Sequence, residues 1–181
     1  MWEASLTPID RGATPAAPIV KGRSAELRRG RVSEDYACYA ISKSVNRRAP
    51  VLAADNPAKI LINSWQYLRS RHRIKPFASC IMPDHSHLVL CLMPGESLSQ
   101  LMEDSNKFTA RDLNKLLKRR GQFWQNGFYD HRCRNDKELY DQCLYNEHNP
   151  VRRGLVITAE TWPYSSAFAA NKWLLDREWW P

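Results

Sequence analysis

Two histidines separated by a single residue, His85 and His87, are the first residues whose spacing suggests chemistry. Pro83-Asp84 before them predicts a turn, and the apolar residues after them predict a strand from about residue 85 to 93. Alternation along that strand places both imidazoles on one face and Ser86 on the other. Two neutral imidazoles on one face can hold a divalent metal ion. An isolated His-x-His is also common on a solvent-facing strand, so the pair suggests a metal site without establishing one.

A tyrosine late in a following predicted helix, Tyr145, is the candidate nucleophile. A phenol in water ionises with a pKa of about 10, so it attacks poorly unless its target is polarised. A metal ion on His85 and His87 would polarise a phosphate by withdrawing charge from its oxygen. The chain holds seven tyrosines, however, and a half-buried structural tyrosine fits the same helical position.

The third metal ligand has three candidates in the segment after Tyr145. Asn149 stands four residues on, so in a continuing helix it lies on the same side, where its carbonyl oxygen can complete the ligand set. Pro150 disfavours helical dihedrals at Asn149. Glu147 and His148 therefore remain alternative candidates for the third metal ligand.

The first half of the chain predicts two strand-helix units. A tyrosine-rich strand is expected over residues 36–45, and Asp55-Asn56-Pro57 has the capping residue and early proline of a helix start. Apolar residues recur at helical spacing after it, and a basic run at 69–73 ends the helix. A second strand is expected over residues 77–82, directly before the histidine strand.

The second half continues the pattern. Ser97 with Gln100 predicts a capping box that opens a long helix, which Gly121 is expected to end. The aromatic segment 123–129 predicts a fourth strand, and Asn135-Asp136 begins a shorter helix that ends at Asn149-Pro150. The order strand, helix, strand, strand, helix, strand, helix predicts an α+β fold: a ferredoxin-like or RRM-like sandwich with one mainly antiparallel sheet and helices packed on it.

The length of 181 residues suits one compact domain with extensions. Residues 1–33 carry three prolines and a basic run without apolar periodicity, so they predict a flexible N-terminal arm that either contacts DNA or is inert. The catalytic domain is expected over 34–168. Residues 169–181 form a C-terminal tail that packs either on the body or on DNA.

The net charge limits the classes of binding partner, and the cysteine pattern indicates the cellular compartment. The formal charge of +8 favours a polyanionic partner, although it does not choose among DNA, RNA and anionic lipid. Five scattered cysteines without a C-x-x-C pair indicate reduced thiols. We expect a cytoplasmic, nucleoid-associated protein, because no apolar run approaches about 20 residues and no secretory signal opens the chain.

Basic residues on the second long helix form a stripe opposite its apolar face, which is either a DNA grip or a solvated surface. Four arginines are expected nearer to Tyr145. The predicted nucleic-acid-binding residues are Lys107, Arg111, Lys115, Lys118, Arg132, Arg134, Arg152 and Arg153. The exposed members of the set Trp124, Phe128 and Tyr129 are candidates to stack unpaired bases, with core packing expected for at least one of them.

Four ordered motifs resemble one family. The run from Met82 to Leu90 is similar to the HUH strand of single-tyrosine transposases, and three further stretches match in order and spacing: residues 123–131, 145–156 and 162–166. Together they resemble the REP-associated tyrosine transposases over roughly residues 36–167. The family usually has a bulky apolar residue between the two histidines, where this chain has Ser86. Because Ser86 faces away from the metal, the substitution is expected to reduce core packing, and a less active member would fit it too.

The resemblance implies a catalytic Tyr145, a metal site of His85, His87 and Asn149 that takes Mg²⁺ or Mn²⁺, and cleavage of single-stranded DNA beside hairpins. Attack on the scissile phosphate would leave a 5′-phosphotyrosine and a free 3′-hydroxyl, which makes strand transfer the reverse of the same step. A monomer is favoured, with a homodimer possible.

Two other classes of function remain open. One is a non-catalytic RRM-like nucleic-acid-binding module, such as a decayed transposase that acts as a DNA-binding repressor. The other is a metallohydrolase that activates water and does not need Tyr145.

Overall fold

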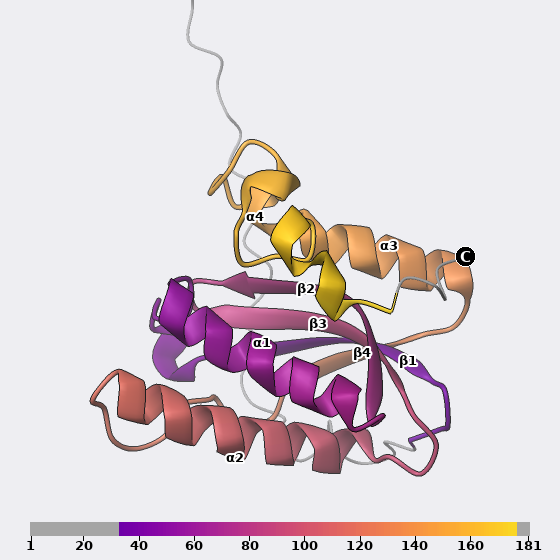
Figure 1. The fold of residues 1–181 in the computed structure, drawn as a ribbon, viewed down its shortest axis with the longest axis horizontal. Helices are drawn as coiled ribbons and strands as arrows, with labels where there is room; N and C mark the ends of the chain where they lie inside the picture. Colours follow the sequence, from indigo (N-terminus) through magenta and orange to yellow (C-terminus); the bar gives the residue numbers. More distant parts are fainter. Residues whose placement is uncertain (1–32, 177–181) are drawn as a thin grey trace, which may run out of the picture.

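The computed structural model describes residues 33–176 of the chain. Its centre is one antiparallel sheet of four strands in the order β2-β3-β1-β4. The strands are β1 (Cys38–Ser44), β2 (Ile74–Met82), β3 (His85–Leu92) and β4 (Tyr129–Cys133). The ferredoxin-like α+β prediction is confirmed, with β1 and β3 in the middle of the sheet and β2 and β4 at its edges (Figure 1).

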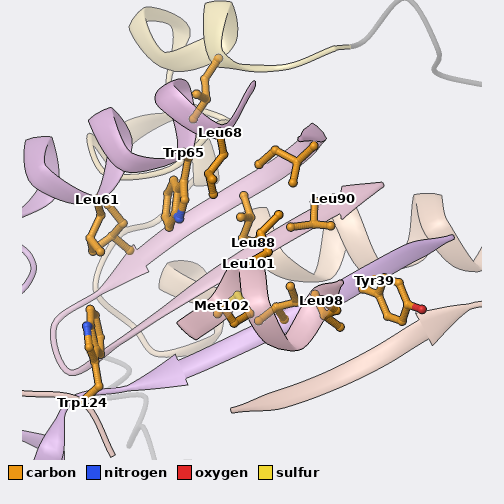
Figure 2. Packing of buried hydrophobic residues seen from close by; sticks show 14 of the residues in the cluster. Tyr39, Leu61, Trp65, Leu68, Leu88, Leu90, Leu98, Leu101, Met102 and Trp124 are labelled. Carbon is orange, nitrogen blue, oxygen red and sulfur yellow. The ribbon is translucent and has the colours of Figure 1, made fainter. Parts of the chain in front are cut away.

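Two helices cover one face of the sheet. They are α1 (Asp55–Ser70) and α2 (Leu98–Leu116). Apolar residues at helical spacing on α1 pack against the leucines that point to this face from β3, with Trp124 closing one end (Figure 2). Burying these side chains against the sheet is the main source of stability for both elements.

The other face carries a shorter helix, α3 (Asp136–Glu147), followed by α4 (Asn149–Arg152) (Figure 1). Leu139 and Cys143 of α3 pack on Val89 and Cys91 of β3 in a second, smaller cluster. Asn135 caps α3 by accepting a hydrogen bond from the Glu138 N–H at 2.9 Å. The sheet therefore separates an α1–α2 layer from an α3–α4 layer.

The predicted strand over 123–129 is wrong, because β4 begins only at Tyr129. Phe123 and Trp124 are consecutive in sequence and both buried in the core. A regular strand points neighbouring side chains to opposite faces, so it cannot bury both in one cluster. The Trp124 indole N–H donates to Thr109 Oγ1 at 3.0 Å, which fixes this segment as an irregular link to α2.

Two predicted helix signals also differ from the structure. Asp55 is the first residue of α1, not its cap, and its carboxylate accepts a hydrogen bond from the Tyr164 hydroxyl at 3.1 Å. α2 ends at Leu116, before Gly121. Lys118, two residues past that end, takes a left-handed φ of 50°.

Residues 169–176 pack on the body, which is one of the two placements expected for the C-terminal tail. A 3₁₀ helix over Ala169–Leu174 brings Leu174 into the core of the α1–α2 layer. Asp176 then accepts a hydrogen bond from the Arg69 guanidinium at 2.7 Å, and its own N–H donates to the Pro76 carbonyl at 2.9 Å. The N-terminal arm (1–32) and residues 177–181 lie outside the described residues.

Truncating Leu174 should therefore destabilise the whole domain. We expect Leu174→Ala to lower the free energy of unfolding by about 2–4 kcal/mol, because it leaves a cavity in a closed cluster. Chemical denaturation measures this change. Lys172→Ala, an exposed change in the same 3₁₀ helix, is the control and should stay within about 0.5 kcal/mol of the parent chain. Equal effects would mean that the segment only rests on the surface.

All five cysteines are free thiols, in agreement with the sequence. Within residues 33–176 the longest helices carry too many polar residues for any of them to traverse a lipid bilayer.

Candidate active site

The histidine pair faces the α3–α4 layer. Alternation along β3 places His85 and His87 on the same side as Val89 and Cys91, which contact α3. The two imidazole rings lie edge to face, with centroids 4.7 Å apart. Ser86 points the other way and lines a small cavity in the α1–α2 layer, as predicted.

His85 is held by the residue before it. Its Nδ1 lies 2.5 Å from Asp84 Oδ1, and Arg48 donates to the other carboxylate oxygen at 3.3 Å. Burial alone would raise the pKa of Asp84, but the hydrogen bond with His85 and the charges around it lower that pKa below its ordinary value. A carboxylate on one ring nitrogen orients a histidine so that the other nitrogen faces a metal. Sequence reasoning missed this role and used Asp84 only as a turn signal.

His87 carries a buried nitrogen without a partner. Its Nε2 is inaccessible to solvent and forms no hydrogen bond with the described residues. Burial, followed by the nearby charges, lowers the pKa of His87 to about 3, so the ring is neutral at physiological pH. An unpaired buried nitrogen costs free energy unless something binds its lone pair. A neutral imidazole of this kind has the chemistry of a ligand for a divalent metal ion, and oriented His85 beside it offers a second nitrogen.

These environments predict acid-sensitive stability. Burial also lowers the pKa of His85, so both rings take up protons more readily in the unfolded chain. Stability is therefore complete above the ordinary histidine pKa of about 6.5 and falls as the pH drops toward the folded value. For His87 we expect a loss of about 2 kcal/mol between pH 7 and pH 5.

Denaturation in chelator at the two pH values checks this expectation. His87→Gln should remove most of the His87 contribution, whereas His72→Gln, at an exposed turn, should retain it. An unchanged pH dependence in His87→Gln would show that this ring is not buried in its neutral form.

Tyr145 lies near the end of α3, on the side of the sheet that the histidine pair faces. Its side chain is 52% exposed, so it is not a core tyrosine. The guanidinium carbon of Arg152 lies 3.4 Å from the centre of its ring, a cation–π contact. The phenol is thus accessible to a substrate and held by α4.

Asn149 is buried at the break between α3 and α4. The helix breaks at His148, and α4 restarts at Asn149 with Pro150 in its first turn, a position that tolerates proline. Pro150 has no N–H to donate to the Asn146 carbonyl, and Asn149 Nδ2 donates to it at 3.3 Å instead. Asn149 Oδ1 then accepts from the Arg152 guanidinium at 2.5 Å. The proline therefore starts a new turn and does not displace Asn149.

The rival third ligands have other contacts. The carboxylate of Glu147 accepts a hydrogen bond from the Ser166 hydroxyl at 2.7 Å, and His148 is exposed, with Nδ1 donating to the Leu144 carbonyl at 2.9 Å. Over residues 33–176, no three His, Cys, Asp or Glu side chains converge as a metal-binding group. Neither rival thus completes the histidine pair as the structure stands, whereas the amide oxygen of Asn149 is a ligand of a different type.

The positive charges of three arginines act on His87. Besides burial and the neighbouring His85, the positive charges of Arg152, Arg48 and Arg153 lower the pKa of His87. All three guanidinium groups therefore lie within electrostatic range of the imidazole. The sequence identified Arg152 and Arg153 but missed Arg48. Arg48 follows the end of β1, which pairs with the start of β3, and no local signal in the sequence shows that pairing.

The other predicted basic residues lie elsewhere. The stripe is on the outer side of α2, across the sheet from Tyr145, where Lys107 pairs with Glu103 at 2.6 Å and Arg111 with Asp112 at 2.9 Å (Figure 1). Lys115 and Lys118 are exposed on the same layer.

Arg132 and Arg134 are also not near the tyrosine. Arg132 is cross-strand from Tyr39, whose ring belongs to the α1–α2 core, and it pairs with Glu34. Arg134 precedes α3, about 16 Å along the helix axis from Tyr145.

Only one of the three aromatic candidates is open to solvent. Trp124 is buried and Phe128 packs against the core, but Tyr129 is 63% exposed. The register aligns Tyr129 of β4 with Ser42 of β1, and Ser42 with His87 of β3. Directly paired residues share a face, so the Tyr129 ring stands in the same cross-strand row as His87.

The chain matches known proteins over most of this domain. The family model described as Transposase IS200 like matches residues 36–142. A REP-associated tyrosine transposase of Escherichia coli K12 is 31% identical over 119 residues, which cover 60% of this chain and 68% of that protein. A Haemophilus influenzae protein provisionally given the same name is 31% identical over 99 residues, 49% of this chain but only 56% of its own length.

A solved structure supports the fold independently. It is described as a REP-associated tyrosine transposase bound to a REP hairpin, and it superposes with a TM-score of 0.62 at 21% identity, covering 75% of this chain and 79% of the other. At that identity the likeness establishes the arrangement of strands and helices. The extent of the family match and the identity to the relatives show that this chain belongs to the IS200-like transposases, in the group of REP-associated tyrosine transposases.

Proposed function

We propose that this protein cleaves and rejoins single-stranded DNA beside hairpins of the REP type, through a covalent bond to Tyr145. One observation carries the proposal. A buried His85 and a partly buried His87, both neutral, face the layer that carries the accessible Tyr145, and Arg152 connects the tyrosine to Asn149 and to the vicinity of His87.

The chemistry follows from these residues. The phenolic oxygen of Tyr145 forms a bond to the scissile phosphorus, and the bond from phosphorus to the 3′ oxygen breaks. The phenol gives up its proton and the departing 3′ oxygen takes one up, so one phosphodiester replaces another. Because the phosphotyrosine bond replaces the broken phosphodiester at little change in energy, a 3′-hydroxyl of another strand can attack it. That attack reverses the step and completes strand transfer.

His85, His87 and Asn149 would hold the metal. The Asp84 carboxylate orients His85, and burial keeps His87 neutral, so both nitrogens are prepared as ligands. Mg²⁺ or Mn²⁺ bound there would draw charge from a phosphate oxygen and so make the phosphorus a better target for a phenol. Asn149 becomes available once Arg152 leaves its oxygen.

The substrate is proposed from the relatives and from the surface. The solved relative is described with a REP hairpin bound, and its fold matches this chain. Arg48 and Arg153, whose charges act on His87, would contact the phosphates next to the histidine pair. Such contacts position a strand without reading its sequence. Tyr129, exposed in the row of His87, is placed to stack an unpaired base beside the scissile phosphate.

The polarity of a covalent adduct tests the proposal. The protein is incubated with Mn²⁺ and a hairpin that has single-stranded flanks, labelled at the 3′ end in one sample and at the 5′ end in another. On a denaturing gel, the 3′ label should move with the protein and the 5′ label should appear as a shorter strand with a free hydroxyl. Chelator should abolish both products.

Three outcomes would contradict this mechanism in whole or in part. Cleavage without an adduct would favour a hydrolase that activates water, and hairpin binding without cleavage would favour the non-catalytic module. A reversed polarity, with the 5′ label on the protein, would keep the nucleophile but refute the proposed leaving group.

A further inference from the structure

We propose that Arg152 is a positioning residue that competes with the metal ion for Asn149 and is displaced when the scissile phosphate binds. The inference rests on the proposed function, since it concerns the order in which that site is assembled. One guanidinium group, that of Arg152, holds both the nucleophile and a predicted metal ligand.

The contacts of Arg152 are with the parts of the site that must change. Its guanidinium donates to Asn149 Oδ1 at 2.5 Å, and its carbon lies 3.4 Å from the centre of the Tyr145 ring. The amide of Asn149 is fixed at its other end by the hydrogen bond from Nδ2 to the Asn146 carbonyl. Asn149 Oδ1 therefore faces one cation, and that cation is the guanidinium.

A metal ion and the Arg152 guanidinium would both bind Asn149 Oδ1. Both are cations that need the lone pairs of Asn149 Oδ1, and Arg152 also lies within electrostatic range of His87. Two positive charges so placed repel each other in a partly buried site. Binding of the ion should therefore be weakened as long as Arg152 stays on Asn149.

A phosphate group resolves the conflict. A guanidinium forms strong, paired hydrogen bonds with phosphate oxygens. Arg152 is exposed on α4, where a bound strand would meet it. A transfer of Arg152 from Asn149 to the phosphate would release the third ligand and the Tyr145 ring together. The metal site and the nucleophile then become complete only when the substrate is in place.

Arg153 provides a matched control. It is the next residue, it carries the same charge, and it also lowers the pKa of His87. Among the described residues, however, the contacts to Asn149 and Tyr145 are made by Arg152. Comparing the two variants separates the loss of the specific contact from the loss of one positive charge.

The test measures Mn²⁺ affinity without DNA, from the EPR signal of the free ion. Arg152→Gln should bind Mn²⁺ about three- to ten-fold more tightly than the parent chain, and Arg153→Gln clearly less so. In an Asn149→Ala background the two arginine variants should have equal effects, because the contested oxygen is gone. With a hairpin bound in a Tyr145→Phe background, which prevents turnover, the advantage of Arg152→Gln should disappear.

Equal tightening by Arg152→Gln and Arg153→Gln in the parent chain would overturn the inference and leave only a general charge effect. An Arg152→Gln advantage that persists in Asn149→Ala would overturn it as well. If His87→Ala binds Mn²⁺ as tightly as the parent chain, the metal site itself fails, which is the failure of the proposed function and is distinguished by that variant alone.

Discussion

Tyr145→Phe is expected to abolish the covalent adduct, with a loss of cleavage of at least about 10³-fold. Phe lacks the hydroxyl but keeps the ring on which Arg152 rests, so hairpin binding should stay within about two-fold. Gel-shift titration and the 3′-label adduct assay measure the two quantities on the same samples.

Tyr140→Phe is the matched control for this prediction. Tyr140 lies on the same helix and is 39% exposed, so the substitution makes the same chemical change on a similar surface. It should leave the adduct intact. An adduct that survives in Tyr145→Phe, or that is lost equally in Tyr140→Phe, would assign the nucleophile to another residue.

His87→Ala should have the second largest effect. Removing one of two histidine ligands is expected to weaken Mn²⁺ binding by about 100-fold or more and to reduce cleavage at a fixed metal concentration at least as much. The EPR titration measures the first effect and the adduct assay the second. Raising the Mn²⁺ concentration should recover part of the activity, because the defect lies first in metal binding.

Ser86→Ala controls for this change, since Ser86 is the neighbouring residue on the same strand and points to the opposite face. It should leave the metal affinity unchanged. A His87→Ala variant with normal metal affinity and normal cleavage would show that the histidine pair is structural.

The sequence was sufficient for the parts of the fold that local rules determine. The alternation of β3, the capping box at Ser97 and the cap at Asn135 each predict an element that the structure contains, because period and capping are local properties. It failed at residues 123–129, where consecutive aromatic side chains are both drawn into one core and no strand can form.

Tertiary contacts account for what the sequence missed in the candidate site. The sequence motifs identified His85, Tyr145 and Asn149. Arg48 comes close to His85 only because β1 pairs with β3, and the sequence does not show that pairing. Arg132 and Arg134 were expected near Tyr145 because they are close to it along the chain. The 12-residue helix α3 separates Arg134 from Tyr145, and Arg132 points to the other face of the sheet.

The distance between the Tyr145 ring and the bound ion tests the account most directly. A fluorotyrosine placed at position 145 reports that distance by ¹⁹F NMR, because Mn²⁺ broadens a resonance steeply as it approaches. We predict strong broadening at position 145 on adding one equivalent of Mn²⁺, little at Tyr67 on α1 across the sheet, and none at either position in His87→Ala. Broadening at position 145 no greater than at Tyr67 would contradict the account.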